Sequence, residues 1–440
     1  MGQPMVTTAP PAGDAPSALR RAGRSATTTP GRLSVIWAVL VALTVAAGLV
    51  SALTAQTKQD TLGDLVEQRE PLAAAAQQVF RSLSDADAVA ASAFLSGGVE
   101  PAALRERYEL DIAQAGAAIG DAAANLGADP VAAGHVSTLS RQLPVYTGLV
   151  ETARANHRQG YPAGAAYLRE ASGLMRSKIL PAAEALYSGD YDQLKAAQAD
   201  ARSFPWAPAA LALLLLVALL GAQVYLTRKT NRLFNVGLAV ATAAVLVGVV
   251  WASAVLFLAA GKVADGERTG SAQADVLVHA RINALKGRAD ETLTLVARGD
   301  GPGYEAEWGQ LVDTLTGDGP ANLLRQAQDM ARTDPITAAM ADADAWRAAH
   351  QRIRELDDSG QYENAVLAAI GSDPQSAATA FGRLDGSLDS AIRAARTEFA
   401  TATAGAGALT TGLSLGLGAL AVVAAAGIST GIRERLREYR

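Results

Sequence analysis

Four long runs of sequence contain no charged residue, and they constrain the fold more than any other feature. The runs lack Asp, Glu, Lys and Arg for 25, 25, 29 and 34 residues. About 20 apolar residues suffice for a helix to cross the hydrocarbon core of a bilayer. Hydrophobic residues make up 50% of the chain and aromatic ones only 5%, which favours long helices over an aromatic-rich β-sandwich. The sequence therefore predicts an all-α membrane protein with four transmembrane helices, at 33–55, 206–226, 234–259 and 405–428.

The first run has an alternative interpretation as a cleaved signal peptide, because basic residues precede it. Its apolar stretch, however, is longer than the roughly 7–15 residues of a usual signal-peptide core. We therefore favour an uncleaved membrane anchor.

Positive charge is concentrated in the short segments that flank these helices. Residues 1–32 carry a net charge of +3, the loop 227–233 carries +3 and the tail 429–440 carries +2. The long segments 56–205 and 260–404 carry −5 and −8. Because short segments rich in Lys and Arg stay in the cytoplasm, both termini are predicted to be cytoplasmic and both long segments extracytoplasmic. This indicates a multi-pass plasma-membrane protein with a basic, disordered N-terminal tail. We favour a role of the tail's arginines in setting the orientation of the chain, and contact with anionic membrane lipids is the alternative.

The two halves of the chain resemble each other. Matching residues recur 200 or 203 positions later: Arg32 and Arg232, Tyr146 and Trp346, Gly160 and Gly360, Asp87 and Asp290. Between the spans, Gly- and Pro-rich turns divide long Ala-, Leu-, Arg- and Glu-containing stretches, and no strand-like alternation occurs. We expect two extracytoplasmic helical-bundle domains arranged as a tandem repeat, the first of them a four-helix bundle. Parallel repeats place both domains on the same side of the membrane.

No pattern typical of an enzyme is found in the sequence. Cysteine is absent, and the four histidines form no H-E-x-x-H pair. The two GDGP turns lack the alternating ligands of a calcium-binding loop. The spans carry no ionisable residue, unlike those of most transporters and pumps. The sequence thus predicts a protein that is not an enzyme, with no cofactor, no metal and no nucleic-acid partner.

One carboxylate is predicted to lie inside the first outer domain. Asp87 falls on an apolar helix stripe with Leu83 and Ala90, and a carboxylate in such a place needs a partner. Arg105 or Arg107 on the following helix is the expected partner. A structural ion pair is the favoured interpretation, and a ligand or partner site is the alternative.

Two further sets of residues are candidates for contacts. The cytoplasmic face offers basic residues to a partner: Arg228, Lys229, Arg232, Arg433, Arg435 and Arg437. Their alternative role is to set the orientation of the chain in the membrane. Gly412 and Gly416 form a G-x-x-x-G pattern, which predicts close packing of helices inside the four-helix membrane bundle.

The stretch 83–98, LSDADAVAASAFLSGG, is followed by Arg105, Arg107, Tyr108 and Asp111. It resembles the first outer domain of four-span actinobacterial membrane proteins that are encoded beside a glutamine-binding lipoprotein and the serine/threonine protein kinase G. This resemblance covers nearly the whole chain. It implies that the outer domains engage an extracytoplasmic solute-binding lipoprotein and that the inner face signals to a cytoplasmic serine/threonine kinase.

The sequence therefore favours a transmembrane signal transducer that relays glutamate-, glutamine- or aspartate-type amino-acid availability. Two alternatives stay open. One is a structural or accessory membrane protein, such as an envelope scaffold or a permease subunit. The other is a direct small-molecule sensor that binds its ligand inside one bundle.

Overall fold

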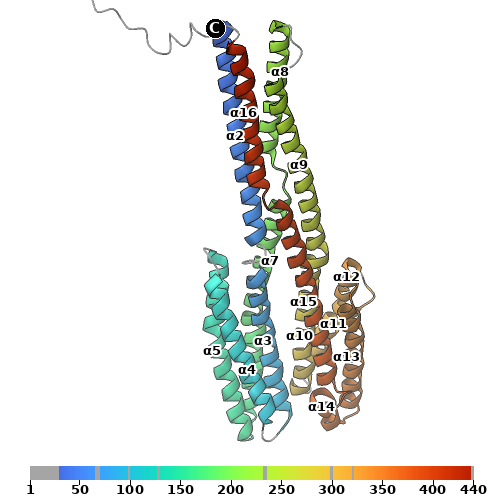
Figure 1. Ribbon diagram of the computed structural model, residues 1–440. Helices are drawn as coiled ribbons and strands as arrows, with labels where there is room; N and C mark the ends of the chain where they lie inside the picture. The colour runs from blue at the N-terminus through green and yellow to red at the C-terminus, as the bar shows by residue number, and fades with distance from the viewer. Residues whose placement is uncertain are drawn as a thin grey trace, which may run out of the picture. The chain divides into compact units, whose positions relative to one another are not determined.

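The structure is a computed structural model that describes residues 29–64, 70–97, 100–125, 129–230, 235–297, 301–319 and 322–437. These residues are helical apart from the short segments that connect the helices, and none of them forms a strand (Figure 1). Residues 1–28 of the predicted tail and 231–233 of the predicted loop lie outside the described residues.

The chain divides into two compact units. The span unit comprises Met1–Gln59, Phe204–Phe257 and Thr410–Arg440, and the bundle unit comprises Asp60–Ser203 and Leu258–Leu409. The two long predicted outer segments therefore form one compact unit rather than two separate ones.

Four helices contribute to the span unit. They are α2 (Thr29–Asp64), α8 (Trp206–Thr230), α9 (Val236–Gly266) and α16 (Leu413–Arg437). The described part of the chain has four helical stretches long and apolar enough to cross a membrane, which confirms that prediction. Large apolar side chains such as Leu49, Leu213 and Val250 are exposed along them. An exposed apolar surface of this extent is typical of a membrane-facing region.

Small residues and buried polar side chains join the helices of the span unit. At Gly237 of α9, an added Cβ would lie 2.6 Å from Cα of Gly431 in α16, so the two backbones touch. Gln223 of α8 donates a hydrogen bond to Thr242 Oγ1 of α9 at 2.8 Å. Close approach at small residues and interhelical hydrogen bonds stabilise helix packing in lipid, where no hydrophobic driving force acts between helices.

The two glycines of the G-x-x-x-G pattern lie in different environments. Gly416 packs against the ring of Trp251 in the same span unit, as predicted. Gly412 instead has φ +79° and lies in the turn between α15 (Ala377–Thr410) and α16. The predicted span 405–428 is therefore not one uninterrupted helix, because a left-handed residue ends α15 inside it.

The helices that connect the two units differ in continuity. Helix α9 passes through the five-residue π-helix η3 (Glu267–Ser271) directly into α10 (Ala272–Ala297). Helix α7 (Leu180–Arg202), by contrast, ends before Pro205, and α8 begins at Trp206. Proline disfavours the helical conformation in the residue before it, which explains this break. The last helix of the first half therefore does not run unbroken into α8.

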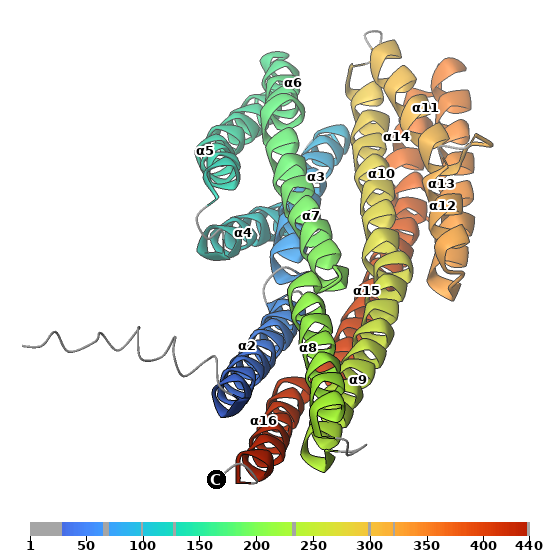
Figure 2. The same ribbon diagram turned by 90° about the horizontal axis from the view of Figure 1, so that it is seen from above.

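The first half of the bundle unit consists of four long helical segments. They are α3 (Glu70–Leu95), α4 (Ala102–Asn125), α5 (Pro130–Arg158) and the run α6 (Ala163–Leu174), η2 (Met175–Ile179) and α7. The predicted turns lie between these segments. The second half is more interrupted. It contains α10, α11 (Pro302–Thr316), α12 (Leu323–Met330), α13 (Asp334–Asp358), α14 (Tyr362–Ile370) and α15 (Figures 1 and 2).

Two helix ends are built alike in the two halves. Gly160 follows α5 with φ +73°, and Gly360 follows α13 with φ +80°. In each case the next residue donates its N–H to a carbonyl five positions earlier: Tyr161 to Asn156 and Gln361 to Leu356. Glycine takes this left-handed position without steric cost. The 200-residue offset thus corresponds to a shared cap, although the tandem repeat as a whole stays a prediction.

Helices α3 and α10 are the central helices of the bundle unit. Every residue from Ser82 to Ala93 of α3 is buried, and so is every residue from Gly287 to Ala297 of α10. Helix α3 contacts α4 and α7 on its own side and α10 of the other half. One apolar stripe was predicted for α3, but the second half of the unit covers its remaining face. That face is polar, and its charges therefore need partners from the second half.

Candidate functional site

Asp87 lies in the interior of the first half, as predicted. It is 2% exposed, and its Oδ1 accepts hydrogen bonds from Tyr146 Oη at 3.1 Å and Ser172 Oγ at 2.9 Å. Burial raises the pKa of Asp87 to about 6, although both hydrogen bonds act in the opposite direction. Asp87 is thus held by two hydroxyl groups, from α5 and α6.

Arg105 and Arg107 pair with other carboxylates than Asp87. Arg105 Nε lies 3.0 Å from Glu109 Oε1, and Arg107 Nη2 lies 3.8 Å from Asp85 Oδ2. Two residues correspond to about 200° of helix rotation, so Asp85 and Asp87 point to opposite sides of α3. Asp85 faces Arg107 of α4, whereas Asp87 faces α5 and α6. The prediction of a buried carboxylate was right, and the prediction of its partner was wrong.

Arg176 connects the halves of the bundle unit near Asp87. It lies in the π-helix η2 and reaches the buried Asp290 of α10, with Nη1 2.5 Å from Oδ1, and Glu307 of α11 at 3.1 Å. Burial raises the pKa of Asp290 to about 7, while Arg176 lowers it and the charges of Glu307 and Asp87 raise it. Arg176 thus contacts Asp290, and its charge also lowers the pKa of Asp87, the residue that matches Asp290 in the predicted repeat. Single π-helical turns occur frequently at functional sites.

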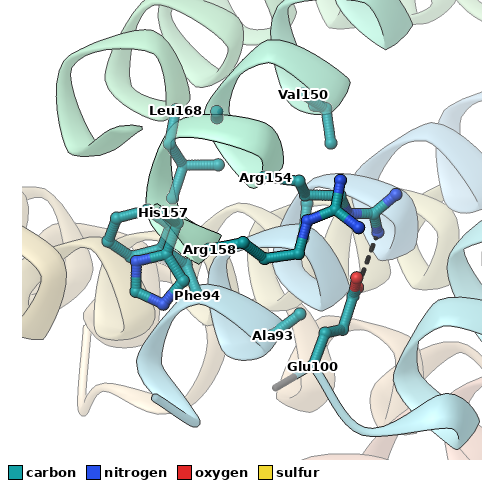
Figure 3. A pocket seen from close by; sticks show the side chains of 10 residues that line it. Ala93, Phe94, Glu100, Val150, Arg154, His157, Arg158 and Leu168 are labelled. Carbon is teal, nitrogen blue, oxygen red and sulfur yellow. Dashed lines mark ion pairs between the residues drawn. The ribbon is translucent and has the colours of Figure 1, made fainter. Parts of the chain in front are cut away.

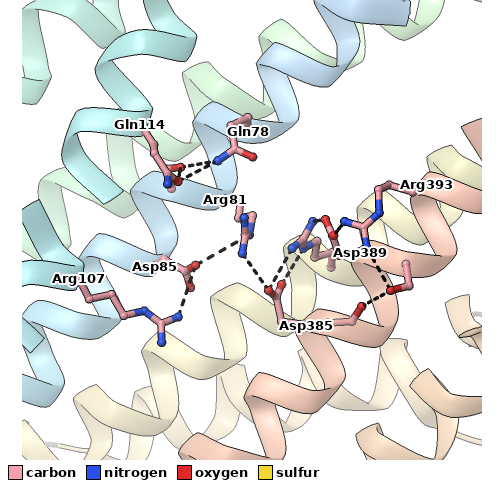
Figure 4. A network of polar contacts seen from close by, with 12 residues as sticks. Gln78, Arg81, Asp85, Arg107, Gln114, Asp385, Asp389 and Arg393 are labelled. Atoms are coloured by element: carbon pink, nitrogen blue, oxygen red, sulfur yellow. Dashed lines mark hydrogen bonds and ion pairs between the residues drawn. The ribbon is translucent and has the colours of Figure 1, made fainter. Parts of the chain in front are cut away.

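A second set of ion pairs lies between α3, α10 and α15 (Figure 4). Arg281 of α10 is 3% exposed and contacts Asp385 through two nitrogens, Nε at 2.7 Å and Nη2 at 3.0 Å, and Asp389 at 2.8 Å. Arg81 of α3 approaches the same Asp385 at 3.4 Å. Burial raises the pKa of Asp385, but Arg281 and Arg81 outweigh burial and hold it below its ordinary value. We call Arg81, Arg281, Asp385 and Asp389 the arginine–aspartate cluster.

The cluster continues to two carboxylates at the contact of α3 and α4. Asp85 is 6% exposed and Asp111 is 7% exposed. Burial raises the pKa of Asp111 to about 7, and the charge of Asp85 raises it further. Burial and the charge of Asp385 raise the pKa of Asp85. Carboxylates with raised pKa values gather at functional sites more often than elsewhere.

A buried histidine connects two acidic residues in the second half. His350 is 2% exposed, with Nδ1 3.2 Å from Glu291 Oε2 and Nε2 3.0 Å from Glu305 Oε1. Its ring stacks on Trp308 at 3.4 Å between centroids. Only the doubly protonated ring donates to both carboxylates. Burial lowers the pKa of His350, but the two carboxylates outweigh burial and raise it above its ordinary value.

We expect His350 to make a pH-dependent contribution to the free energy of unfolding. Because the folded-state pKa is raised, this contribution is complete below about pH 6.5, the unfolded value. It is lost as the pH rises through the folded value. Replacing His350 by glutamine should lower the free energy of unfolding by about 1–3 kcal/mol at low pH. Thermal unfolding of both proteins across the pH range tests this, and a constant or widening difference toward alkaline pH would contradict it.

The bundle unit contains a cavity between α3, α5 and α6 (Figure 3). Its walls are mainly apolar, with Phe94, Val150 and Leu168 among them, and its polar corner holds Glu100 and Arg154. The volume that the centre of a water molecule can occupy is about 20 Å³. The whole hollow, including the open solvent at its mouth, has a volume of about 380 Å³. The enclosed part has room for one water molecule.

The predicted cytoplasmic contact residues are only partly described. Arg228 at the end of α8 and Arg433 in α16 are exposed. Arg232 and the side chains of Lys229, Arg435 and Arg437 lie outside the described residues. The described part of the chain holds no group of three or more potential metal ligands.

The comparisons with known proteins concern this same region. Residues 61–199 match the family model of the actinobacterial sensor domain. The match covers less than half of the chain and includes Asp87, Arg105, Arg107 and Arg176. It supports an actinobacterial sensor protein. No curated protein and no solved structure matches the chain.

Sequence reasoning did not single out three of the residues that organise the site. Asp290 carried a signal, because it matches Asp87 in the predicted repeat, but its contact with Arg176 did not. Arg281 and His350 lie in helices without a motif. Their partners come from segments 45–108 positions away, so only folding brings them together.

Proposed function

We propose that the protein is a non-enzymatic transmembrane signal transducer for amino-acid availability. In this proposal, an extracytoplasmic solute-binding lipoprotein loaded with glutamate, glutamine or aspartate engages the bundle unit. A cytoplasmic serine/threonine kinase then reads the change at the inner face. The sensor-domain match over residues 61–199 is the observation that carries the proposal.

The interior of the bundle unit supports such a role physically. Its two halves meet through charged and polar contacts, centred on Arg176 and on the arginine–aspartate cluster. Ion pairs and hydrogen bonds lost in a small shift are partly replaced by water, so a polar contact can change at lower cost than an apolar core. The raised pKa values of Asp87 and Asp290 mean that the present arrangement holds carboxylates at a cost in free energy.

A route for the signal along the chain is available in one helix. Helices α9, η3 and α10 follow one another without a non-helical residue. Asp290, the partner of Arg176, is in α10. We propose that a shift of α10 against η2 is transmitted along this continuous helix.

Affinity purification of the full-length protein from detergent-solubilised membranes, with and without amino acids, tests the proposal. We expect a solute-binding lipoprotein to co-purify, with a retention that changes with glutamate, glutamine or aspartate, and a kinase in the same eluate. Arg176→Gln should abolish the amino-acid dependence, whereas Arg169→Gln, an exposed change on the neighbouring α6, should leave it unchanged. Recovery of permease or envelope components alone, insensitive to amino acids, would favour an accessory or structural protein instead.

A further inference from the structure

The polar corner of the cavity has hydrogen-bonding capacity that the described residues do not use. Arg154 Nη2 lies 2.9 Å from Glu100 Oε1, yet neither atom has a partner in hydrogen-bond geometry within the described part of the chain. Arg154 Nε is likewise buried without such a partner there. Within that part of the chain, Nη1 is the one guanidinium nitrogen with a hydrogen bond, which it donates to Glu151 Oε1 at 2.6 Å. A buried, charged donor without an acceptor is costly, so this corner favours an additional acceptor.

Arg154 is held in place for such a role. Its side chain is 10% exposed, and its guanidinium lies over the ring of Tyr108, 4.2 Å from the centroid. Stacking on an aromatic ring fixes the plane of an arginine and presents its N–H groups edge-on. Tyr108 Oη is also buried and lacks a hydrogen-bond partner among the described residues.

The charge of the lining indicates the class of ligand. Arg154 and Arg158 outnumber Glu100, and His157 is the remaining polar residue of the lining (Figure 3). The other walls are small or apolar, with Ala93, Phe94 and Leu168 among them. Two parallel N–H groups of arginine match a carboxylate, and apolar walls match a short carbon chain. A bulky ligand suits neither feature.

We propose that this cavity binds a small organic carboxylate, with Arg154 as the residue that holds the carboxylate group. Binding widens the enclosed space as Arg154 exchanges Glu100 for the ligand. Two kinds of ligand that carry a carboxylate group fit this site. A simple carboxylate uses Arg154 alone, whereas an α-amino acid also places its ammonium group on the released Glu100. This site belongs to the chain itself and does not depend on the relay proposed above.

Calorimetric titration of the purified full-length protein in detergent tests the site without any partner protein. The probes are acetate, L-glutamate, L-glutamine and inorganic phosphate. We expect saturable binding of at least one carboxylate and much weaker binding of phosphate. Arg154→Gln should weaken carboxylate binding by about tenfold or more, the effect of losing a charge-assisted bidentate contact. Arg141→Gln, an exposed change on the same helix α5, should leave binding unchanged.

Two further variants keep the test decisive if Arg154→Gln folds poorly. Ala93→Leu fills the cavity without changing any charge and should abolish binding. Glu100→Gln releases Arg154 and removes the acceptor for an ammonium group. If the ligand is a simple carboxylate, this variant should bind acetate more strongly. If the ligand is an amino acid, the variant should bind the amino acids more weakly.

Three results would overturn the proposal: no saturable binding of any carboxylate, phosphate binding as tight as carboxylate binding, or full binding by the Ala93→Leu variant. Because the titration contains only this chain, its failure leaves the relay through a binding protein standing. Failure of the affinity purification likewise leaves the cavity standing.

Discussion

Replacing Arg281 by alanine is expected to lower the free energy of unfolding by about 3–5 kcal/mol, the usual cost of removing one partner from a buried ion pair. The guanidinium is almost fully buried and contacts both Asp385 and Asp389. Without it, Asp385 keeps a single ion-pair partner among the described residues, Arg81 at 3.4 Å. Chemical denaturation of the full-length protein in detergent measures the loss.

Arg393→Ala is the matched control. Arg393 also pairs with Asp389, but its side chain is 67% exposed. An exposed ion pair contributes about 0–1 kcal/mol, so this variant should unfold almost like the unmodified protein. Equal losses for the two variants would contradict the assignment of Arg281 as the central residue of the cluster.

The effect of Arg281→Ala should also depend on pH. The pKa of Asp385 is lowered in the folded protein, so its ion pair stabilises the fold above the ordinary carboxylate value and ceases to do so as the pH falls through the folded value. The difference between the two proteins should therefore narrow in acid. A difference that stays constant down to pH values below the folded pKa would show that lost packing, not lost charge, is responsible.

Replacing Asp87 by asparagine is expected to raise the free energy of unfolding near neutral pH by about 1–3 kcal/mol. The folded pKa is about 6 and the ordinary value is 3.8. Because the folded protein binds this proton more tightly, Asp87 costs stability as the pH rises from the ordinary value through the folded value. Asparagine keeps an acceptor for Tyr146 and Ser172 and carries no charge.

The pH profile of the variant separates this explanation from others. Below about pH 4, where Asp87 is protonated in both states, the two proteins should be nearly equally stable. Asp344→Asn, an exposed change in α13, should show no effect at any pH. A variant that is less stable than the unmodified protein at neutral pH would mean that the Asp87 charge is needed to hold Arg176.

Stabilisation by Asp87→Asn would also bear on function. A stabilising substitution commonly costs function where activity needs a strained or destabilised site. If Asp87 and Asp290 together position Arg176, asparagine should give a more stable protein with a weaker response to amino acids in the purification described above.

The helical class and the four spans could be predicted because each depends on local pattern. An uncharged run of 25 residues cannot be accommodated easily outside a membrane, and Gly160 ends α5 through its own backbone freedom. The burial of Asp87 followed in the same way from helical spacing. Local rules, however, place a residue on a face without saying what covers that face.

Only the tertiary structure decided which charges meet. Asp85 and Asp87 are two residues apart, yet Asp85 faces Arg107 of α4 and Asp87 faces hydroxyl groups of α5 and α6. The second half of the chain covers α3, and Arg81 and Arg176 find their acidic partners there. These partners are 304 and 114 positions away in the sequence. The sequence by itself thus determined the helices and the membrane character. The polar site was determined by the packing of one half of the bundle unit against the other, because the partners of a charge at their contact come from both halves.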